Sequence, residues 1–335
     1  MSELQKAAWR FEAGAVSAAI SGGVAAVGLG DGRIRLIDLA DPREATLKMV
    51  AAHKGSVLAI AGTKDGFVSG SDDGRLVAVS RAGDVTELGL WRGRQLDTLT
   101  VTADGTVAVA VGRQIELFNG TERRSLGPHP STVAGLHSRG SLLAAAHYDG
   151  ATLWDLADPA AEPRRLTWKG SHLAAALSPD GRVLCTSTQD GEVHGWNLAA
   201  SGEMRMSGYG AKVRALSWSA DGQWLAAAGV PLLHCWPFDG PGPEGRAPLD
   251  LHDGGEVPTT AVACHPFLPL IAGGYADGML VLGDTNAKGV RGEPIRVSKR
   301  EITALAWSAD GRALVAAAGD GKALTMTLPI PVGLR

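Results

Sequence analysis

Cysteine is scarce in this chain of 335 residues, which has only Cys185, Cys235 and Cys264. The number is odd, the three positions are far apart, and no Cys-x-x-Cys pair occurs. Neither a disulfide framework nor a zinc ribbon fits that spacing. We therefore expect three buried thiols in a reducing compartment.

Long hydrophobic runs and an excess of one charge are also absent. No run reaches the roughly 18 apolar residues of a membrane-spanning helix, and the N-terminal residues lack the apolar segment of a signal peptide. The 32 Lys and Arg residues nearly balance 35 Asp and Glu residues, giving a net charge of −3. A whole-surface binder of nucleic acid or anionic lipid would be more basic. These absences predict a cytoplasmic protein without membrane association.

Catalytic and metal-binding motifs are missing as well. The chain contains no Gly-x-Ser-x-Gly, His-Glu-x-x-His or Gly-x-x-x-x-Gly-Lys-Ser/Thr motif. His194 and His234 occupy equivalent positions in neighbouring repeats, which should lie about 10 Å apart, whereas two ligands of one zinc ion each lie about 2 Å from it. We therefore predict no catalytic residue, no cofactor and no metal site, and histidines that pack in the interior.

Glycine, in contrast, is abundant, with 45 residues, about twice its usual share of ~7%. So many glycines predict many turns and exclude long helices, because a glycine inside a helix costs about 1 kcal/mol relative to alanine. The chain is also longer than the roughly 250–300 residues at which one core stops growing, which indicates two domains or a repeat.

A repeat of eight units accounts for the length. Each unit reads as an apolar strand, a turn such as Ser178-Pro-Asp-Gly181, a strand of small residues, an Asp-Gly turn, and a third strand with an aromatic or apolar end. A fourth strand precedes the next unit. The third strands end 36 to 47 residues apart, at Ile37, Val79, Phe118, Trp154, Trp196, Trp236, Gly283 and Met326.

The last unit lacks a fourth strand, because the chain ends within nine residues of Met326. The segment Lys6–Phe11 precedes the first unit where a fourth strand would stand, and adding it to the last sheet would close a ring. We therefore predict one all-β domain over 1–335, an eight-bladed propeller with four antiparallel strands per blade, with seven blades as the alternative. The approximate blades are 12–50, 51–89, 90–127, 128–167, 168–207, 208–251, 252–298 and 299–329, with a closing strand at 5–11.

These units resemble WD40 repeats over almost the entire chain. The resemblance lies in the period near 40, the turn Ser71-Asp-Asp-Gly74, the endings Trp154-Asp155 and Trp196-Asn197, and a histidine that opens a unit. It implies a buried tetrad of His, Ser or Thr, Asp and Trp in each blade, although no unit here has all four. The residues that match the tetrad, and to which we assign a structural role, are His53, Ser69, Asp73, His129, Asp149, Trp154, Thr186, Asp190, Trp196 and Trp236.

The loops that lead into the first strands should emerge with the Asp-Gly turns on one side of the disc, here called the top face. Aromatic and cationic residues, which are frequent in binding hot spots, gather in these loops. The predicted partner-binding residues are Trp91, Arg92, Arg94, Trp168, Lys169, His172, Tyr209, Lys212, Arg214, Lys299 and Arg300. In the competing interpretation Trp91 and Trp168 only pack between blades, and the cations are ordinary solvated residues.

The main functional hypothesis is a non-catalytic scaffold, a monomeric disc in a larger complex, that binds a protein or peptide of acidic character on the top face. One alternative is an enzyme or small-ligand binder that uses the central channel. The small apolar innermost strands, such as Ala174–Leu177, disfavour it. Another alternative is nucleic-acid binding through the cationic loops, against which the net charge argues.

Overall fold

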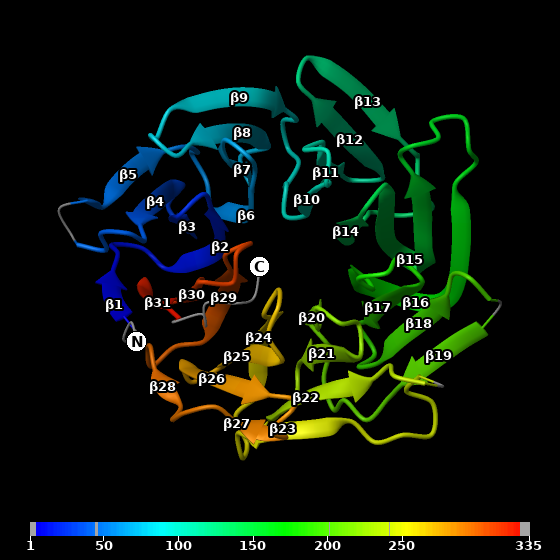
Figure 1. The fold of residues 1–335 in the computed structure, drawn as a ribbon. Helices are drawn as coiled ribbons and strands as arrows, with labels where there is room; N and C mark the ends of the chain where they lie inside the picture. The colour runs from blue at the N-terminus through cyan, green and yellow to red at the C-terminus, as the bar shows by residue number, and fades with distance from the viewer. Residues whose placement is uncertain (1–4, 44–45, 201, 241, 329–335) are drawn as a thin grey trace.

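The protein is a ring of antiparallel β-sheets (Figure 1). The computed structural model describes residues 5–43, 46–200, 202–240 and 242–328. These ranges contain strands β1 to β31 and no α-helix. It follows that none of the described segments is a helix that could cross a membrane.

The strands fall into four concentric positions, and the two inner positions hold the most buried residues. Small side chains dominate the second position, where β30 is buried along its whole length. The innermost strands are β2 (Ala15–Ser21), β6 (Val57–Gly62), β10 (Leu99–Val101), β14 (Gly135–Arg139), β20 (Ala215–Trp218), β24 (Thr259–Cys264) and β29 (Ile302–Trp307). The second strands are β3 (Val24–Leu29), β7 (Gly66–Ser71), β11 (Val107–Val111), β17 (Val183–Thr188), β21 (Trp224–Ala228), β25 (Leu270–Tyr275) and β30 (Ala313–Ala318).

The third and outer strands complete each unit. The third strands are β4 (Arg33–Asp38), β8 (Arg75–Ser80), β12 (Gln114–Asn119), β18 (Val193–Asn197), β22 (Leu232–Pro237), β26 (Met279–Asp284) and β31 (Lys322–Thr327). The outer strands are β5 (Lys48–Ala51), β9 (Val85–Leu90), β13 (Glu122–Leu126), β19 (Gly202–Met206), β23 (Leu249–Asp253), the short pair β27 (Gly289–Val290) and β28 (Ile295–Arg296), and β1 (Gln5–Arg10). Every third strand contains the end predicted from the repeat.

Two strands of 14 residues, β15 (Leu142–Asp155) and β16 (Arg164–Leu177), fill the remaining positions. Residues five apart in a straight strand are separated by about 17 Å, yet His147 Nε2 lies 2.9 Å from Thr152 Oγ1. β15 therefore folds back on itself as a hairpin and supplies a second and a third strand. β16 bends after Trp168, whose carbonyl oxygen lies 2.8 Å from His172 Nε2, so it serves first as an outer and then as an innermost strand.

These long strands join the fourth and fifth units into one sheet. The pairing of Tyr148 with Ser171 continues the hydrogen-bonded ladder from β15 to β16, so β14 to β19 form a single sheet. The ring has seven continuous sheets, which is the alternative count. The predicted eight-bladed arrangement is therefore corrected, because the fourth and fifth blades are joined instead of separate. The joined sheet holds the strand positions of both units. The all-β propeller with four antiparallel strands per blade is confirmed.

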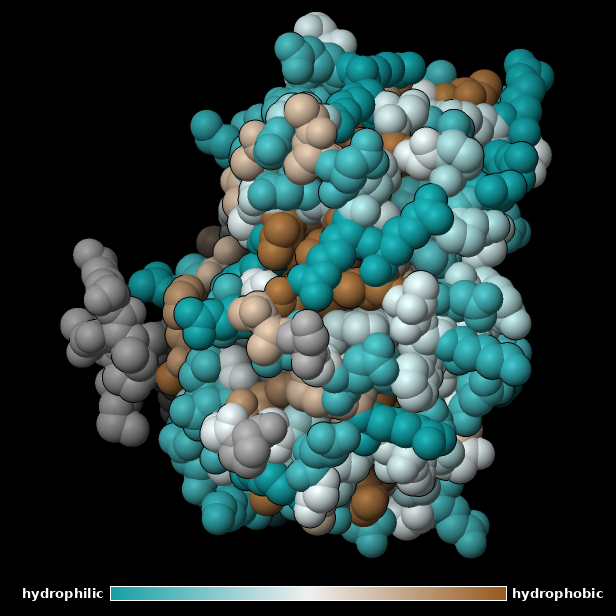
Figure 2. Space-filling view, turned by 90° about the vertical axis from the view of Figure 1, so that its right-hand side faces the viewer, coloured by the Kyte–Doolittle hydropathy of each residue, from teal (hydrophilic) through white to brown (hydrophobic). Residues whose placement is uncertain are grey.

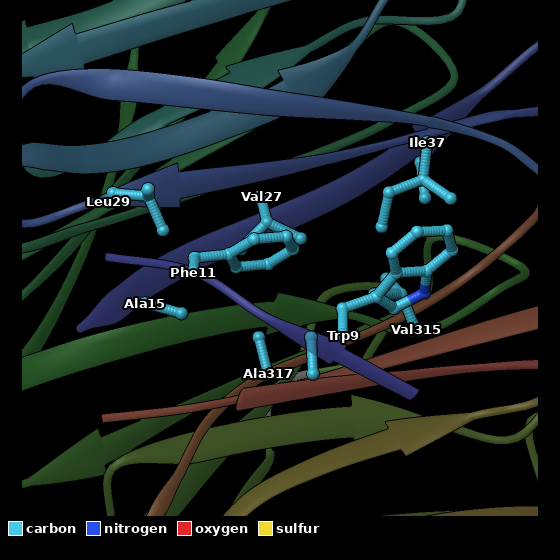
Figure 3. Close-up of a cluster of buried hydrophobic side chains, with 10 residues drawn as sticks. Trp9, Phe11, Ala15, Val27, Leu29, Ile37, Val315 and Ala317 are labelled. Atoms are coloured by element: carbon cyan, nitrogen blue, oxygen red, sulfur yellow. The ribbon is translucent and has the colours of Figure 1, made fainter. Parts of the chain in front are cut away.

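The N-terminal strand closes the ring as expected. β1 pairs with β31 over six residues, from Gln5 opposite Thr327 to Arg10 opposite Lys322. Trp9 and Phe11 enter a core between the last and first units, where Val315 and Val27 also lie (Figure 3). The Trp9 indole donates to Thr325 Oγ1 at 3.1 Å. Closure therefore combines strand pairing with the burial of two aromatic side chains.

The Ser-x-Asp-Gly turns have one geometry in three units. The serine hydroxyl donates to the aspartate two residues later at 2.5 to 2.6 Å, in Ser178 with Asp180, Ser219 with Asp221, and Ser308 with Asp310. In each turn a glycine follows in the left-handed region, at φ 69 to 70°. These side-chain bonds replace backbone partners that a tight turn cannot supply, and they fix the hairpin register.

The rim of the disc is mainly polar. Figure 2 views it from the side of β15, β16 and β19, where hydrophilic side chains cover most of the surface and hydrophobic ones form small separate patches. The outer strand β13 follows this pattern, since its first four residues are all exposed. The interactions that bury apolar surface therefore lie mainly between units rather than on the rim.

Candidate functional site: the top face

The loops into the innermost strands and the turns between second and third strands form one face, as predicted from the strand order. Backbone hydrogen bonds tie several of these loops to a neighbouring turn. Trp91 N donates to Gly74 O at 2.8 Å, and Val297 N donates to Gly278 O at 3.0 Å. Gly74 has a φ of 79°, and a Cβ there would lie 2.2 Å from the Trp91 carbonyl oxygen, so this position requires glycine.

All seven cations of the predicted binding set are exposed on this face. Within the described ranges none of them forms an ion pair, whereas Arg33, Arg35 and Arg75 on the third strands are each paired with a carboxylate. The seven are Arg92, Arg94, Lys169, Lys212, Arg214, Lys299 and Arg300. Exposed carboxylates stand among them, including Glu12, Asp253, Glu256 and Glu301. The face is thus mixed in charge, with cations free to pair with an incoming group.

His172 and Tyr209 are interior residues, which corrects their assignment to the binding surface. His172 is 1% exposed, and its Nδ1 lies 2.7 Å from Thr186 Oγ1. The Tyr209 hydroxyl lies 2.8 Å from His234 Nε2 and accepts a hydrogen bond from Trp236 Nε1 at 2.7 Å. Both side chains occupy the place that a tetrad histidine has in other units, so their polar atoms are already used inside the blade.

The second unit forms the polar network that the family resemblance implies. His53 Nε2 lies 2.8 Å from Ser69 Oγ, and His53 Nδ1 lies 3.4 Å from Asp73 Oδ1. Lys54 N also donates to the Asp73 carboxylate at 2.8 Å. Burial lowers the pKa of His53, although the nearby Asp73 opposes this effect.

The fourth and fifth units depart from that network. Trp154 Nε1 donates to His129 Nε2 at 3.3 Å, but the Asp149 carboxylate accepts the Gly170 amide at 3.3 Å instead of binding a histidine. In the fifth unit Asp190 is exposed and binds no histidine. The two turn carboxylates that the repeat places in blade networks therefore face the surface here.

Trp91 and Trp168 are both packed and partly exposed, so neither sequence interpretation is complete. The Trp91 ring meets Phe118 edge to face, with the ring centroids 6.1 Å apart. The Trp168 ring stacks on His194 at 4.0 Å with an interplanar angle of 16°. Each indole thus has one fixed side against a blade and remains half-buried.

A cavity of about 520 Å³ lies in the central channel. Strands β2, β6, β20, β24 and β29 contribute mostly small or apolar residues to it, and Arg214 and Glu301 provide its charged groups. In the described part of the chain no three His, Cys, Asp or Glu side chains come together as ligands for a metal ion. The lining offers no cluster of acid and base groups for the alternative of channel catalysis.

A second cavity, of about 630 Å³, lies beside Trp168 where the fourth and fifth units join. We call it the Trp168 cavity. It is lined by Tyr148, Trp168, Lys169, Gly170, Ser171, Gln189, Asp190, Glu192 and Arg205. Tyr148, Glu192 and Arg205 were missed by the sequence analysis, and only the Tyr-Asp-Gly turn at 148–150 marks the site in the sequence.

Buried nitrogen atoms without partners gather under this cavity. The described residues leave four such side-chain atoms, and three of them are His194 Nδ1, His194 Nε2 and Trp196 Nε1. Burial lowers the pKa of His194 to about 4, so the ring is neutral near pH 7. Glu203 Oε2 lies 4.0 Å from His194 Nε2, beyond hydrogen-bond distance.

The indole N–H of Trp196 has no hydrogen-bond partner, whereas that of Trp236 has one, and this contrast gives a matched stability test. Trp196→Phe removes an indole N–H that has no partner, whereas Trp236→Phe removes one that donates to the buried Tyr209 hydroxyl. We expect Trp236→Phe to lower the free energy of unfolding by about 1 kcal/mol more, the net worth of one buried hydrogen bond. Denaturant unfolding of both variants measures the difference. Equal losses would contradict the assignment, since the two side chains are similarly buried, at 4% and 8% exposure.

Comparison with known proteins agrees with this architecture. The family model described as "WD domain, G-beta repeat" matches residues 203–230 and 292–324. No curated protein matches the sequence. The fold is similar to the crystal structure of the computationally designed Ika8 protein, with a TM-score of 0.77, 18% identity, and 95% of this chain and 98% of that chain covered. It is also similar to a chain in the crystal structure of the Mitotic Checkpoint Complex, with a TM-score of 0.67, 17% identity, and 97% and 95% covered.

Proposed function

We propose that this β-propeller, two segments of which match the WD40 repeat model, is a non-catalytic scaffold that binds an acidic segment of a partner protein on its top face. The observation that carries this proposal is the set of seven exposed cations without ion pairs in the loops of that face. A cation without an internal partner can bind a carboxylate of the partner protein without first breaking an ion pair. Complementary charges on the two surfaces also increase the rate of association.

Arg214, Lys299 and Arg300 lead into the innermost strands β20 and β29, whose residues line the channel cavity. Arg214 lines the channel cavity, and Glu301, next to Arg300 in sequence, lines it too. A partner segment crossing the channel mouth would meet these three cations together. The side chains below them are small or apolar, so they supply packing surface and few competing charges.

A disc that works as one subunit of an assembly fits the rest of the molecule. The similar chain in the Mitotic Checkpoint Complex belongs to such an assembly. The three cysteines are unpaired, and two of them are buried, which supports a reducing and hence cytoplasmic environment.

Charge reversal on one face tests the proposal. The variant Arg214→Glu, Lys299→Glu, Arg300→Glu should lose more than about tenfold in affinity for the native partner, because like charges then oppose each other across the interface. Partners are recovered from cell extract with the tagged protein, identified by mass spectrometry, and measured by isothermal titration calorimetry.

The matched control reverses three exposed cations in turns of the opposite face, Lys64, Arg139 and Lys288, which like the top-face cations form no ion pair with the described residues. It changes the net charge by the same amount, so it separates a local effect from a general one. Equal binding by the wild type and the top-face variant would disprove the proposal. Equal loss in both variants would show a non-specific charge effect and would also count against it.

A further inference from the structure

The Trp168 cavity differs in chemistry from the rest of the top face. Its lining sets two aromatic side chains, Tyr148 and Trp168, beside two carboxylates, Asp190 and Glu192, and it also includes the cations Lys169 and Arg205. Tyr148 is 52% exposed, although large aromatic side chains are usually covered in a folded protein. An exposed aromatic pair beside carboxylates is the arrangement that attracts organic cations.

The backbone holds Tyr148 in this exposed position. Its amide donates to Ser131 Oγ at 2.8 Å, and the register of β15 against β16 shifts between Tyr148 and Gly150. The next residue, Asp149, has a φ of 63°, one of only two non-glycine residues with positive φ among those described. Such a conformation is costly for a residue with a side chain, and here it directs the strand turn that carries Tyr148.

Trp168 is fixed in a different way. Its ring lies flat on His194, which is neutral near pH 7 because burial lowers its pKa to about 4. The stack therefore does not already supply a cation to the indole. One ring face is covered by His194, and a ligand would contact the part of the indole that lines the cavity.

The carboxylates at the cavity are unequally engaged. Glu192 holds the Arg205 guanidinium through two hydrogen bonds, one of them 3.0 Å long, from Arg205 Nε. Asp190 accepts no hydrogen bond and forms no ion pair with the described residues. Glu192 thus shows that this wall stabilises a guanidinium, and Asp190 leaves a second carboxylate free to do so.

The local charge balance favours a cation as the ligand. Two carboxylates, Asp190 and Glu192, and two cations, Lys169 and Arg205, line the cavity, and a third carboxylate, Asp149, accepts the amide of the lining residue Gly170 at 3.3 Å. Arg205 is neutralised by Glu192, so Lys169 at the rim is the one cation that would repel an incoming positive group.

We propose that the Trp168 cavity binds the ammonium or guanidinium group of a lysine or arginine side chain, placed against the Tyr148 and Trp168 rings with Asp190 as its counter-ion. This site goes beyond the binding of an acidic segment to the cations near the channel. It would bind a basic residue at a fixed place on the same face, so that the protein recognises an acidic segment near the channel and a basic side chain at the Trp168 cavity.

The test uses three small probes and needs no knowledge of the partner: the N-acetyl amides of lysine, arginine and norleucine. Norleucine amide has an apolar chain of similar length without the charge. Binding is followed through the indole N–H signals of the nine tryptophans by nuclear magnetic resonance, with Trp168→Phe used only to assign the Trp168 signal. We expect the lysine or arginine probe to shift that signal and norleucine amide to leave it in place.

Three variants then test the recognition itself. Tyr148→Ala and Asp190→Asn should each weaken the binding of the cationic probe about three- to tenfold, which is the range of a single cation–π or exposed ionic contact. Lys169→Gln should strengthen it, because it removes the repelling charge. Unchanged signals of the other tryptophans in each variant would show that the blade remains folded.

Three results would overturn the cation site. The norleucine probe could shift the Trp168 signal as much as the lysine probe, no probe could shift it, or acetate could shift it in a manner that Lys169→Gln abolishes. The last result would make this cavity an anion site. None of these outcomes depends on the charge-reversal experiment at the channel mouth, so the two proposals fail separately.

Discussion

We expect a protein without residues 2–10 to lose its cooperative unfolding transition, because its folded state would no longer be stable at physiological temperature. The deletion removes the six residue pairs between β1 and β31 and the buried Trp9. Loss of a buried tryptophan costs about 3–5 kcal/mol by itself, a large share of the 5–15 kcal/mol by which most domains are stable. It would also expose the edge of β31, which can pair with another chain and lead to aggregation. Thermal unfolding by circular dichroism and size-exclusion chromatography measure both effects.

Single substitutions separate the packing from the pairing. Trp9→Ala should destabilise the protein by about 3–5 kcal/mol, whereas Lys6→Ala, on an exposed position of the same strand, should change stability by less than about 0.5 kcal/mol. A synthetic peptide of residues 1–14 should restore cooperative unfolding to the deleted protein by taking the place of β1. A deleted protein as stable as the full chain would show that ring closure does not stabilise the fold.

Acid is expected to destabilise the protein well before its carboxylates titrate. Burial lowers the pKa of eight of the nine histidines, and His137 and His194 reach about 4. The unfolded chain binds these protons near pH 6.5, so the stabilisation is fully present above about pH 6.5 and is lost as the pH falls towards 4. Each unit of difference between the pKa in the unfolded and in the folded state corresponds to about 1.4 kcal/mol, so His137 and His194 would each contribute about 3 kcal/mol to that loss.

Denaturant midpoints measured between about pH 7.5 and 4.5 check this slope. His137 Nδ1 accepts the Leu177 amide at 3.1 Å, a bond that protonation would break. His194 has no hydrogen-bond partner, so His194→Phe should reduce the acid sensitivity without leaving a polar group unsatisfied. A stability that stays constant down to about pH 4.5 would contradict the neutral, buried state of these rings.

Much of the fold could be predicted because its information is local. The Ser-x-Asp-Gly turns form their hydrogen bonds within five residues, and the alternation of the strands between them is visible along the chain. Counting strands was enough to predict that residues 6–11 close the ring. The last unit lacks a fourth strand, and the N-terminal segment supplies one strand more than the first unit needs. Such features need no knowledge of distant contacts.

The junction of the fourth and fifth units could not be predicted, because it depends on which atoms of distant segments meet. The sequence shows Tyr-Asp-Gly at 148–150 as one more hairpin turn, yet Tyr148 pairs with Ser171 and the two blades share a sheet. His172, four residues after Trp168, takes the buried place expected for the residue at the loop start. A register shift of one or two residues decided which side chain is buried and which is exposed.

The scarcity of cysteine, of long apolar runs and of catalytic motifs excluded whole classes of protein, and the repeat determined the propeller and the face on which its loops gather. Those conclusions depend on composition and period, which the sequence contains in full. Whether a given loop residue is free, paired or buried was decided only by the tertiary structure. Exposure and ion pairing depend on packing between segments that are separated in the chain, as Asp149 and Gly170 are, and a local residue pattern does not specify which side chains meet.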